Sequence, residues 1–282
     1  MSREDGVPAD TIAAEILAYY ERGAERERLL FGRGELERVR TRELLTRHLP
    51  AAPASVLDVG GGWGVHAFWL TEQGYDVHLI DPVPGHIEQA RERMSEPGVY
   101  PLASARVGDA RQLDQASDSV DTVLLLGPLY HLPERADRLL ALREARRVLR
   151  TDGLVFAVGI SRFASLLDGL NGQRLNDPEF ARIVEQDLRD GQHRNPSERQ
   201  GYFTTAFFHH PDELREEVAA AEFAVADILG IEGPGYWMVH DLEARLSDPA
   251  QREQLLLAAR AIEREPTLLG LGPHVMAIAR KE

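Results

Sequence analysis

The chain has 282 residues, enough for one large domain or two ordinary ones, and we expect a single core with additions. Its net charge of −14 and pI near 5.2 argue against a nucleic-acid partner, because binding to phosphates needs a basic surface. Cysteine is absent, which excludes disulfides, cysteine metal sites and thiolate nucleophiles, and we expect no metal.

The first ten residues lack the pattern of a secretory or transit segment. No apolar run approaches the roughly 18 residues that a membrane span needs. We therefore expect a cytoplasmic protein without a membrane partner. All basic residues except Lys281 are arginine, which together with abundant alanine and glycine suggests a GC-rich bacterial genome.

Two helices are predicted ahead of any strand. Apolar residues recur at helical spacing over 11–20 and again over 35–49, where Pro50 ends the second helix. The charged run at 21–28 between them is typical of a solvated helix face. Residues 1–50 are thus predicted to form an N-terminal helical cap.

Short apolar strands then alternate with helices, a pattern typical of βαβ units and a parallel sheet. The predicted strands are 56–59, 77–80, 103–107, 120–126 and 154–160, and the predicted helices are 65–73, 85–94 and 133–152. The strand at 120–126 is the most apolar, so we expect it to be central. Residues 51–160 form the predicted core domain.

The alternation breaks after residue 160. Residues 161–210 are predicted to form a helical lid insertion, with helices at 163–170 and 178–188 and a polar loop at 190–201. Residues 211–282 complete the sheet with a helix at 211–221, a strand at 223–231, a second helical insert at 232–270 and a last strand at 274–280. The predicted fold class is α/β: a doubly wound, seven-stranded Rossmann-like sheet with N-terminal helices and helical lid insertions after strand five.

The most informative stretch joins the first predicted strand to its helix. It reads SVLDVGGGWGVHA over 55–67, with the spacing Asp58-x-Gly60-x-Gly62-x-Gly64. Glycines let the backbone turn tightly and leave main-chain N–H groups open to a ligand. Counted from Gly60, a dinucleotide fingerprint would require Gly or Ala at position 65, where the chain has Val65, so a nicotinamide site is the less favoured interpretation.

This stretch is similar to the glycine-rich loop of class I S-adenosylmethionine-dependent methyltransferases. Three further strand ends fit the same family, namely Asp81-Pro82, Asp109-Ala110 and Leu126-Gly127. Ligands of open α/β sheets bind outside the carboxyl ends of the strands, where all four segments are expected. The resemblance covers residues 55–160 and implies an antiparallel final strand beside strand six.

The resemblance implies that the chain binds S-adenosylmethionine and releases S-adenosylhomocysteine. Gly60, Gly62 and Gly64 would pass under the methionine portion of this cofactor. Asp58 would face its ammonium group or orient the loop.

The later strand ends would hold the nucleoside. Asp81, followed by Pro82, would accept hydrogen bonds from both ribose hydroxyls. Asp109 and Ala110 would contact the adenine, and Leu126 would line the cofactor.

The leading helices are also similar to those of small-molecule methyltransferases, in which a tyrosine closes over the site and an arginine can hold the cofactor carboxylate. Tyr20 and Arg40 are the candidates here. Arginine suits a carboxylate because its guanidinium can bind both oxygens.

The segment 126–133 resembles the loop after strand four in many bacterial small-molecule methyltransferases, and it would place Tyr130 and His131 over the donor methyl. His131, together with Tyr20, is a candidate to take or orient the acceptor proton, since the pKa of histidine suits proton transfer near neutrality. Structural capping or packing against the cofactor is the alternative for His131.

Tyr20, Tyr130 and Phe208 are predicted to help hold an acceptor ring. Four more residues are candidates for the acceptor wall: Phe207, His209, His210 and Trp237. Adjacent histidines on an extended segment point to opposite sides, so at most one of the pair should face the pocket. Ordinary packing or helix capping is the alternative for all four.

We therefore predict methyl transfer to a small, aromatic or indole-type natural-product acceptor through a nitrogen, oxygen or carbon nucleophile. The indole C3 of a cyclic dipeptide is one specific candidate. A non-catalytic S-adenosylmethionine-binding protein and an NAD-dependent dehydrogenase are the alternatives, and a homodimer is left open.

Overall fold

The computed structural model describes residues 14–21, 28–199 and 201–282. Within these ranges nine strands form one sheet: β1 (Ser55–Val59), β2 (Asp76–Asp81), β3 (Ser104–Val107), β4 (Val120–Leu125), β5 (Leu149–Ser161), β6 (Gln192–His193), β7 (Ala206–His209), β8 (Phe223–Gly230) and β9 (His274–Lys281). The α/β class is confirmed. The predicted count of seven strands is wrong, because the first insertion adds β6 and β7 at one side of the sheet.

The strand order is β3-β2-β1-β4-β5, and β9 lies between β5 and β8. The first five strands are parallel, whereas β9 is antiparallel to both neighbours, as the sequence predicts. The order reverses between β1 and β4, so a crevice is expected at their carboxyl ends. β4 is central, in agreement with its apolar sequence.

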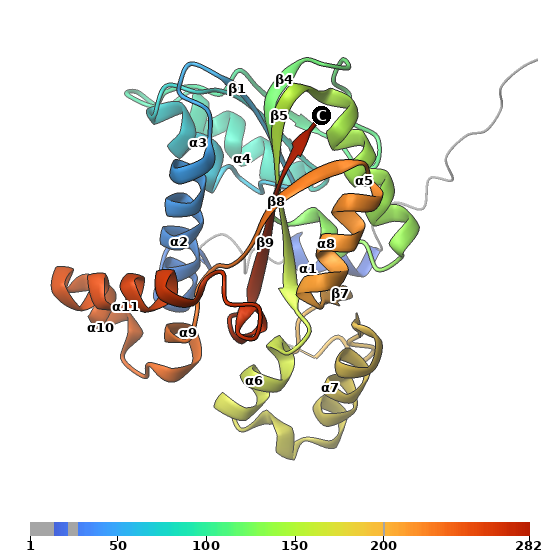
Figure 1. Ribbon diagram of the computed structural model, residues 1–282, viewed down its shortest axis with the longest axis vertical. Coiled ribbons are helices and arrows are strands. Elements are labelled where there is room, and N and C mark those ends of the chain that lie inside the picture. Colours follow the sequence, from blue (N-terminus) through green and yellow to red (C-terminus); the bar gives the residue numbers. More distant parts are fainter. Residues whose placement is uncertain (1–13, 22–27, 200) are drawn as a thin grey trace, which may run out of the picture.

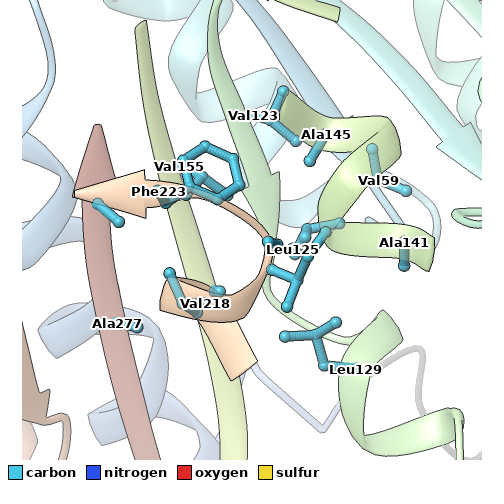
Figure 2. Packing of buried hydrophobic residues seen from close by; sticks show 14 of the residues in the cluster. Val59, Val123, Leu125, Leu129, Ala141, Ala145, Val155, Val218, Phe223 and Ala277 are labelled. Atoms are coloured by element: carbon cyan, nitrogen blue, oxygen red, sulfur yellow. The ribbon is translucent and has the colours of Figure 1, made fainter. Parts of the chain in front are cut away.

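Helices cover both faces of the sheet (Figure 1). One face carries α5 (Arg135–Val148) and α8 (Pro211–Ala220), and the other carries α2 (Gly32–His48), α3 (Val65–Glu72) and α4 (Pro84–Met94). Figure 2 shows Ala141 and Ala145 of α5 and Val218 of α8 packed near Leu125 of β4. This burial fixes the strands on which the functional residues stand.

The remaining helices come from the N-terminus and the two inserts: α1 (Ala14–Glu21), α6 (Ala164–Asn171), α7 (Pro178–Asp190), α9 (Gly235–Met238), α10 (Leu242–Ser247) and α11 (Pro249–Ile262). Three short 3₁₀ segments are η1 (Pro128–His131), η2 (Arg174–Asn176) and η3 (Leu269–Leu271). In Figure 1, α6 and α7 lie beyond the end of β5, and α9 to α11 lie beside α2. No helix among the described residues is long and apolar enough to cross a membrane.

Some predicted boundaries need correction. The predicted loop at 190–201 contains β6, which pairs with β7. β5 begins at Leu149, five residues before the predicted start at Leu154. Part of the predicted first helix (11–13) and most of the charged run (22–27) lie outside the described residues. The division of the chain into four parts stays a prediction.

Candidate active site

Two cavities meet at the carboxyl ends of the central strands. The first extends over the loop after β1 and the ends of β2 and β4, and the second is lined mainly by residues of the two inserts. Tyr20, Arg28 and Tyr130 line both, so the cavities adjoin.

Most of the residues predicted to hold the cofactor line the first cavity. The predicted residues found there are Tyr20, Asp58, Gly60, Gly62, Asp81, Pro82, Asp109, Ala110, Leu126, Tyr130 and His131. Two predicted contacts, Gly64 and Arg40, do not line this cavity.

The loop after β1 needs glycine for steric reasons. Gly60 has φ +68°, and a Cβ there would stand 2.7 Å from the side chain of Pro128. Gly64 has φ +92° and begins α3, with the ring of Phe68 3.0 Å from the position of a Cβ. Gly64 therefore permits the turn before α3 and the close packing of Phe68. It does not line the first cavity, so the structure does not support its predicted contact with the cofactor.

Asp58 is a buried carboxylate without a protein partner. It is 1% exposed, and neither of its oxygens has a hydrogen-bond partner among the described residues. Burial, together with the nearby charge of Asp81, raises the pKa of Asp58 to about 7. Because an unpaired buried carboxylate is costly, this site fits a ligand that brings a cationic group, such as the ammonium of S-adenosylmethionine.

Asp81 is held at the end of β2 by three donors. Its carboxylate accepts hydrogen bonds from the backbone N–H groups of Gly62 (2.8 Å) and Val83 (2.9 Å) and lies 2.9 Å from Nδ1 of His86. Asp81 therefore ties the glycine loop to β2 while it lines the cavity. A fixed carboxylate at this place fits a ribose diol.

Asp109 follows β3 and is engaged by Arg111. The backbone N–H and the guanidinium of Arg111 both donate to its carboxylate. Burial raises the pKa of Asp109, but these hydrogen bonds outweigh burial and lower it. Asp109 is thus ionised and fixed at the cavity wall.

Arg40 is a structural residue. Its side chain is fully buried and donates to the carbonyl of Ile231 (2.9 Å), to Glu43 (2.7 Å) and to Glu263 (2.6 Å). The predicted contact with the cofactor carboxylate is therefore wrong, because all three partners hold the guanidinium between α2 and the second insert. Arg28 is the arginine at the cavities, where it pairs with Glu37.

Tyr20 and His131 meet across the first cavity. The hydroxyl of Tyr20 lies 2.5 Å from Nε2 of His131, and their rings pack edge to face. Burial lowers the pKa of His131 to about 4, although a hydrogen bond with the backbone of Thr205 partly raises it. His131 is therefore neutral near pH 7, and its Nε2 shares a hydrogen bond with the hydroxyl of Tyr20.

The second cavity has an aromatic wall. Of the aromatic residues predicted to hold an acceptor ring, Phe207 does not line it, whereas four do: Tyr20, Tyr130, Phe208 and Trp237. The aromatic residues that line it are Tyr19, Tyr20, Tyr130, Phe180, Tyr202, Phe203, Phe208, Tyr236 and Trp237. The indole N–H of Trp237 is buried and has no hydrogen-bond partner within the described part of the chain.

Phe207, His209 and His210 lie elsewhere, which corrects their predicted role. The guanidinium of Arg138 lies over the Phe207 ring at 3.6 Å, and Nε2 of His209 lies 3.2 Å from Glu217. His210 stands at the N-cap of α8. Alternation along β7 turns Phe208 to the cavity and its two neighbours to the helix face.

Sequence reasoning missed a polar group where the cavities adjoin. Glu37 lines the first cavity, His274 lines the second, and Nδ1 of His274 lies 2.6 Å from the buried carboxylate of Glu232. Ligand atoms of these three residues lie within 4.8 Å of one another, an arrangement that could also hold a metal ion. Arg28 already pairs with Glu37, and His274 with Glu232, so a metal ion would have to displace these partners.

A signal for this group exists in the sequence. Glu232 follows β8 and His274 begins β9, and antiparallel pairing brings these two ends to the same edge of the sheet. Polar residues at such positions are candidates of the same kind as those after β1, β2 and β3.

Residues 56–153 match the family model described as a methyltransferase domain. The chain is 29% identical over 202 residues to a ubiquinone biosynthesis O-methyltransferase of Azorhizobium caulinodans, which covers 67% of this chain and 70% of that protein. It is 34% identical over 114 residues to the methyltransferase GfsG of Streptomyces halstedii, which covers 40% of each chain.

A solved structure has a similar fold. It is a Thermotoga maritima protein described as an SAM-dependent methyltransferase, possible histamine N-methyltransferase, with a TM-score of 0.59 and 19% identity. The match covers 95% of this chain and 99% of the other. At this identity the likeness concerns the fold, while the matched methyltransferase domain argues against the dehydrogenase alternative.

Proposed function

Since the chain is an S-adenosylmethionine-dependent methyltransferase, we propose that it methylates a small aromatic acceptor that binds in the second cavity. The observation that supports this proposal is the pair of adjoining cavities. One has the polar groups that a nucleoside and an amino acid need, and the other has the aromatic wall that a flat ring needs.

The first cavity would hold the methyl donor. Asp58 would pair with the ammonium group, Asp81 would accept from the ribose hydroxyls, and Asp109 with Ala110 would contact the adenine. S-adenosylmethionine supplies an activated methyl group on a positively charged sulfur, so the protein contributes mainly binding and orientation.

Arg28 would take the place that the sequence assigned to Arg40. Arg28 lines both cavities, and Glu37 orients its guanidinium through hydrogen bonds that include one of 3.1 Å. A cation at this position suits the cofactor carboxylate.

Tyr20 and His131 would close the first cavity over the donor. Because His131 is neutral and its Nε2 is hydrogen-bonded to Tyr20, we propose that this pair orients the acceptor and limits access of water. A role of His131 as a base would require Tyr20 to move away first.

The acceptor cavity sets the substrate class. Aromatic side chains from α1, η1, α9 and the segment before β7 would stack on a ring, and the indole N–H of Trp237 offers a hydrogen bond to a polar substituent. A natural-product acceptor, with the indole C3 of a cyclic dipeptide as a specific case, remains part of this proposal, as do the cytoplasmic location and a homodimer.

The test is a binding and turnover experiment. Calorimetric titration with S-adenosylmethionine, S-adenosylhomocysteine and NAD should show binding of the first two only. Mass spectrometry should then detect a methylated product and S-adenosylhomocysteine with at least one aromatic hydroxyl, amine or indole compound. Tight binding of S-adenosylhomocysteine without turnover of any such compound would contradict the proposal.

A further inference from the structure

His274 and Glu232 form a buried pair at the end of the second cavity. Nδ1 of His274 lies 2.6 Å from Oε1 of Glu232, and the backbone N–H of His274 donates to Oε2 of the same carboxylate at 3.2 Å. Glu232 is 1% exposed and His274 is 8% exposed. The two contacts fix the imidazole ring and its tautomer, since Nδ1 must carry the proton that is shared with the carboxylate.

Because Nδ1 of His274 is bonded to Glu232, Nε2 is the ring nitrogen that can bond to a molecule in the cavity. It makes no hydrogen bond within the ranges that the structure describes, and the residue lines the aromatic cavity. The ring of Tyr130, which lines both cavities, has its centroid 6.4 Å from that of His274. Nε2 is thus available on the acceptor side of the place where the two cavities adjoin.

The carboxylates around His274 make its imidazole a stronger base, and the neutral ring that can accept a proton is the form present above its raised pKa. The ionisable groups near it are Glu37, Glu232, Arg28, Tyr130 and Tyr236. Burial alone lowers the pKa of His274, but the carboxylates of Glu37 and Glu232 outweigh burial and the charge of Arg28, so the pKa lies above the usual value. His131 is a weaker base than His274, because burial lowers the pKa of His131. Its Nε2 is also already hydrogen-bonded to the hydroxyl of Tyr20.

We propose that His274 is the base that takes the proton of a phenol-type hydroxyl bound in the second cavity, and that Glu232 positions it. The acceptor class is therefore an aromatic compound with an ionisable O–H group. This inference rests on the proposed methyltransferase function and deepens it.

The proposed reaction breaks two bonds, O–H and S–CH3, and forms two, N–H and O–CH3. The O–H bond of the acceptor breaks and its proton passes to Nε2 of His274. The electron pair left on oxygen forms the O–CH3 bond, and the pair of the breaking S–CH3 bond stays on sulfur, which becomes neutral. The imidazolium of His274 later returns its proton to water, while Glu232 and Glu37 stabilise its charge in the meantime.

One test measures acceptor ionisation without turnover. 4-Nitrophenol is bound to the protein in the presence of S-adenosylhomocysteine, and the absorbance of nitrophenolate is followed against pH. In the wild-type protein the titration of the bound phenol should shift to lower pH by about one unit or more, because the imidazolium stabilises the phenolate.

The variants isolate the imidazole. His274→Asn keeps a donor near the position of Nδ1 but removes Nε2, and it should abolish the shift; Glu232→Gln should reduce it. His240→Gln, at an exposed histidine outside both cavities, is the matched control and should keep the shift. Titration with S-adenosylhomocysteine shows whether each variant is folded.

Turnover gives the second readout. With a phenol acceptor, His274→Asn should lower kcat by about 10² to 10⁴-fold with little change in KM, and its rate should recover as rising pH ionises the phenol in solution. An equal titration shift in wild type and His274→Asn, or no binding of 4-nitrophenol to the wild type, would overturn the inference. If nitrogen or carbon acceptors are nevertheless methylated, the proposed function stands without it.

Discussion

The hydroxyl of Tyr20 and Nε2 of His131 lie 2.5 Å apart, although 111 positions separate the two residues in the chain. The contact joins α1 to η1, the short helix after β4. Both residues line the first cavity, and Tyr20 also lines the second. This hydrogen bond therefore connects α1 to the place where the two cavities meet.

Tyr20→Phe removes that hydrogen bond and keeps the ring. A hydrogen bond contributes about 1 kcal/mol, so S-adenosylhomocysteine should dissociate several-fold faster from the variant. Stopped-flow measurement of the dissociation rate checks this. Tyr75→Phe, which removes a hydroxyl bonded to the carbonyl of Pro50, is the control and should keep the wild-type rate. An unchanged rate in Tyr20→Phe would contradict the closing role of the pair.

Binding of the cofactor should depend on pH through Asp58. With a pKa of about 7 in the ligand-free protein, this carboxyl is protonated below pH 7 and must lose its proton when a cationic ammonium binds. The affinity for S-adenosylhomocysteine should therefore fall as the pH falls below that value, by up to about tenfold per pH unit, and should level off above it. Calorimetric titration over this range measures the effect. Asp58→Asn should bind weakly with little dependence on pH, and the same slope in this variant would show that another group titrates.

Gly60→Ala and Gly98→Ala form a matched pair. Both positions have positive φ, which costs a residue with a Cβ about 1 kcal/mol or more, but only Gly60 has a neighbour, Pro128, at 2.7 Å from that Cβ. Gly60→Ala should thus lose S-adenosylhomocysteine binding and have the lower melting temperature. Gly98→Ala should bind the ligand as the wild type does. Equal binding by both variants would mean that the loop after β1 does not contact the ligand.

Arg40→Met separates stability from binding. The change leaves Glu263 with Arg47 as its remaining guanidinium partner, and breaking a buried ion pair costs about 3 kcal/mol or more. Denaturant unfolding should show this loss of stability, while the affinity for S-adenosylhomocysteine stays within a factor of about three, since the guanidinium of Arg40 is already bonded to Ile231, Glu43 and Glu263. A large loss of affinity with unchanged stability would restore the role that the sequence suggested for Arg40.

Much of the lining of the first cavity was predictable because it depends on short-range patterns. Asp58, Asp81 and Asp109 each follow a predicted strand, and parallel strands bring their carboxyl ends to one edge. The spacing of the glycines reflects positive φ and close approach, which are properties of the local backbone.

The lining of the second cavity was less predictable, because long-range packing decides which side chain faces the cavity. Phe208 and Phe207 are neighbours on β7, yet only Phe208 lines the second cavity. Arg28 stands at the end of a charged run that reads as solvent-exposed, and its pairing with Glu37 depends on where the chain turns before α2. Glu232 and His274 are 42 positions apart and meet only through the pairing of β8 with β9.

The most direct test of the two-cavity account compares methyl transfer by the wild type and Ser165→Trp. Ser165 is buried on α6 and lines the second cavity but not the first, so the larger side chain should block the acceptor and leave the donor site intact. With S-adenosylmethionine and a panel of aromatic hydroxyl, amine and indole compounds, mass spectrometry should detect a methylated product from the wild type only, although both proteins bind S-adenosylhomocysteine. Equal product from both proteins, or none from the wild type, would contradict the account.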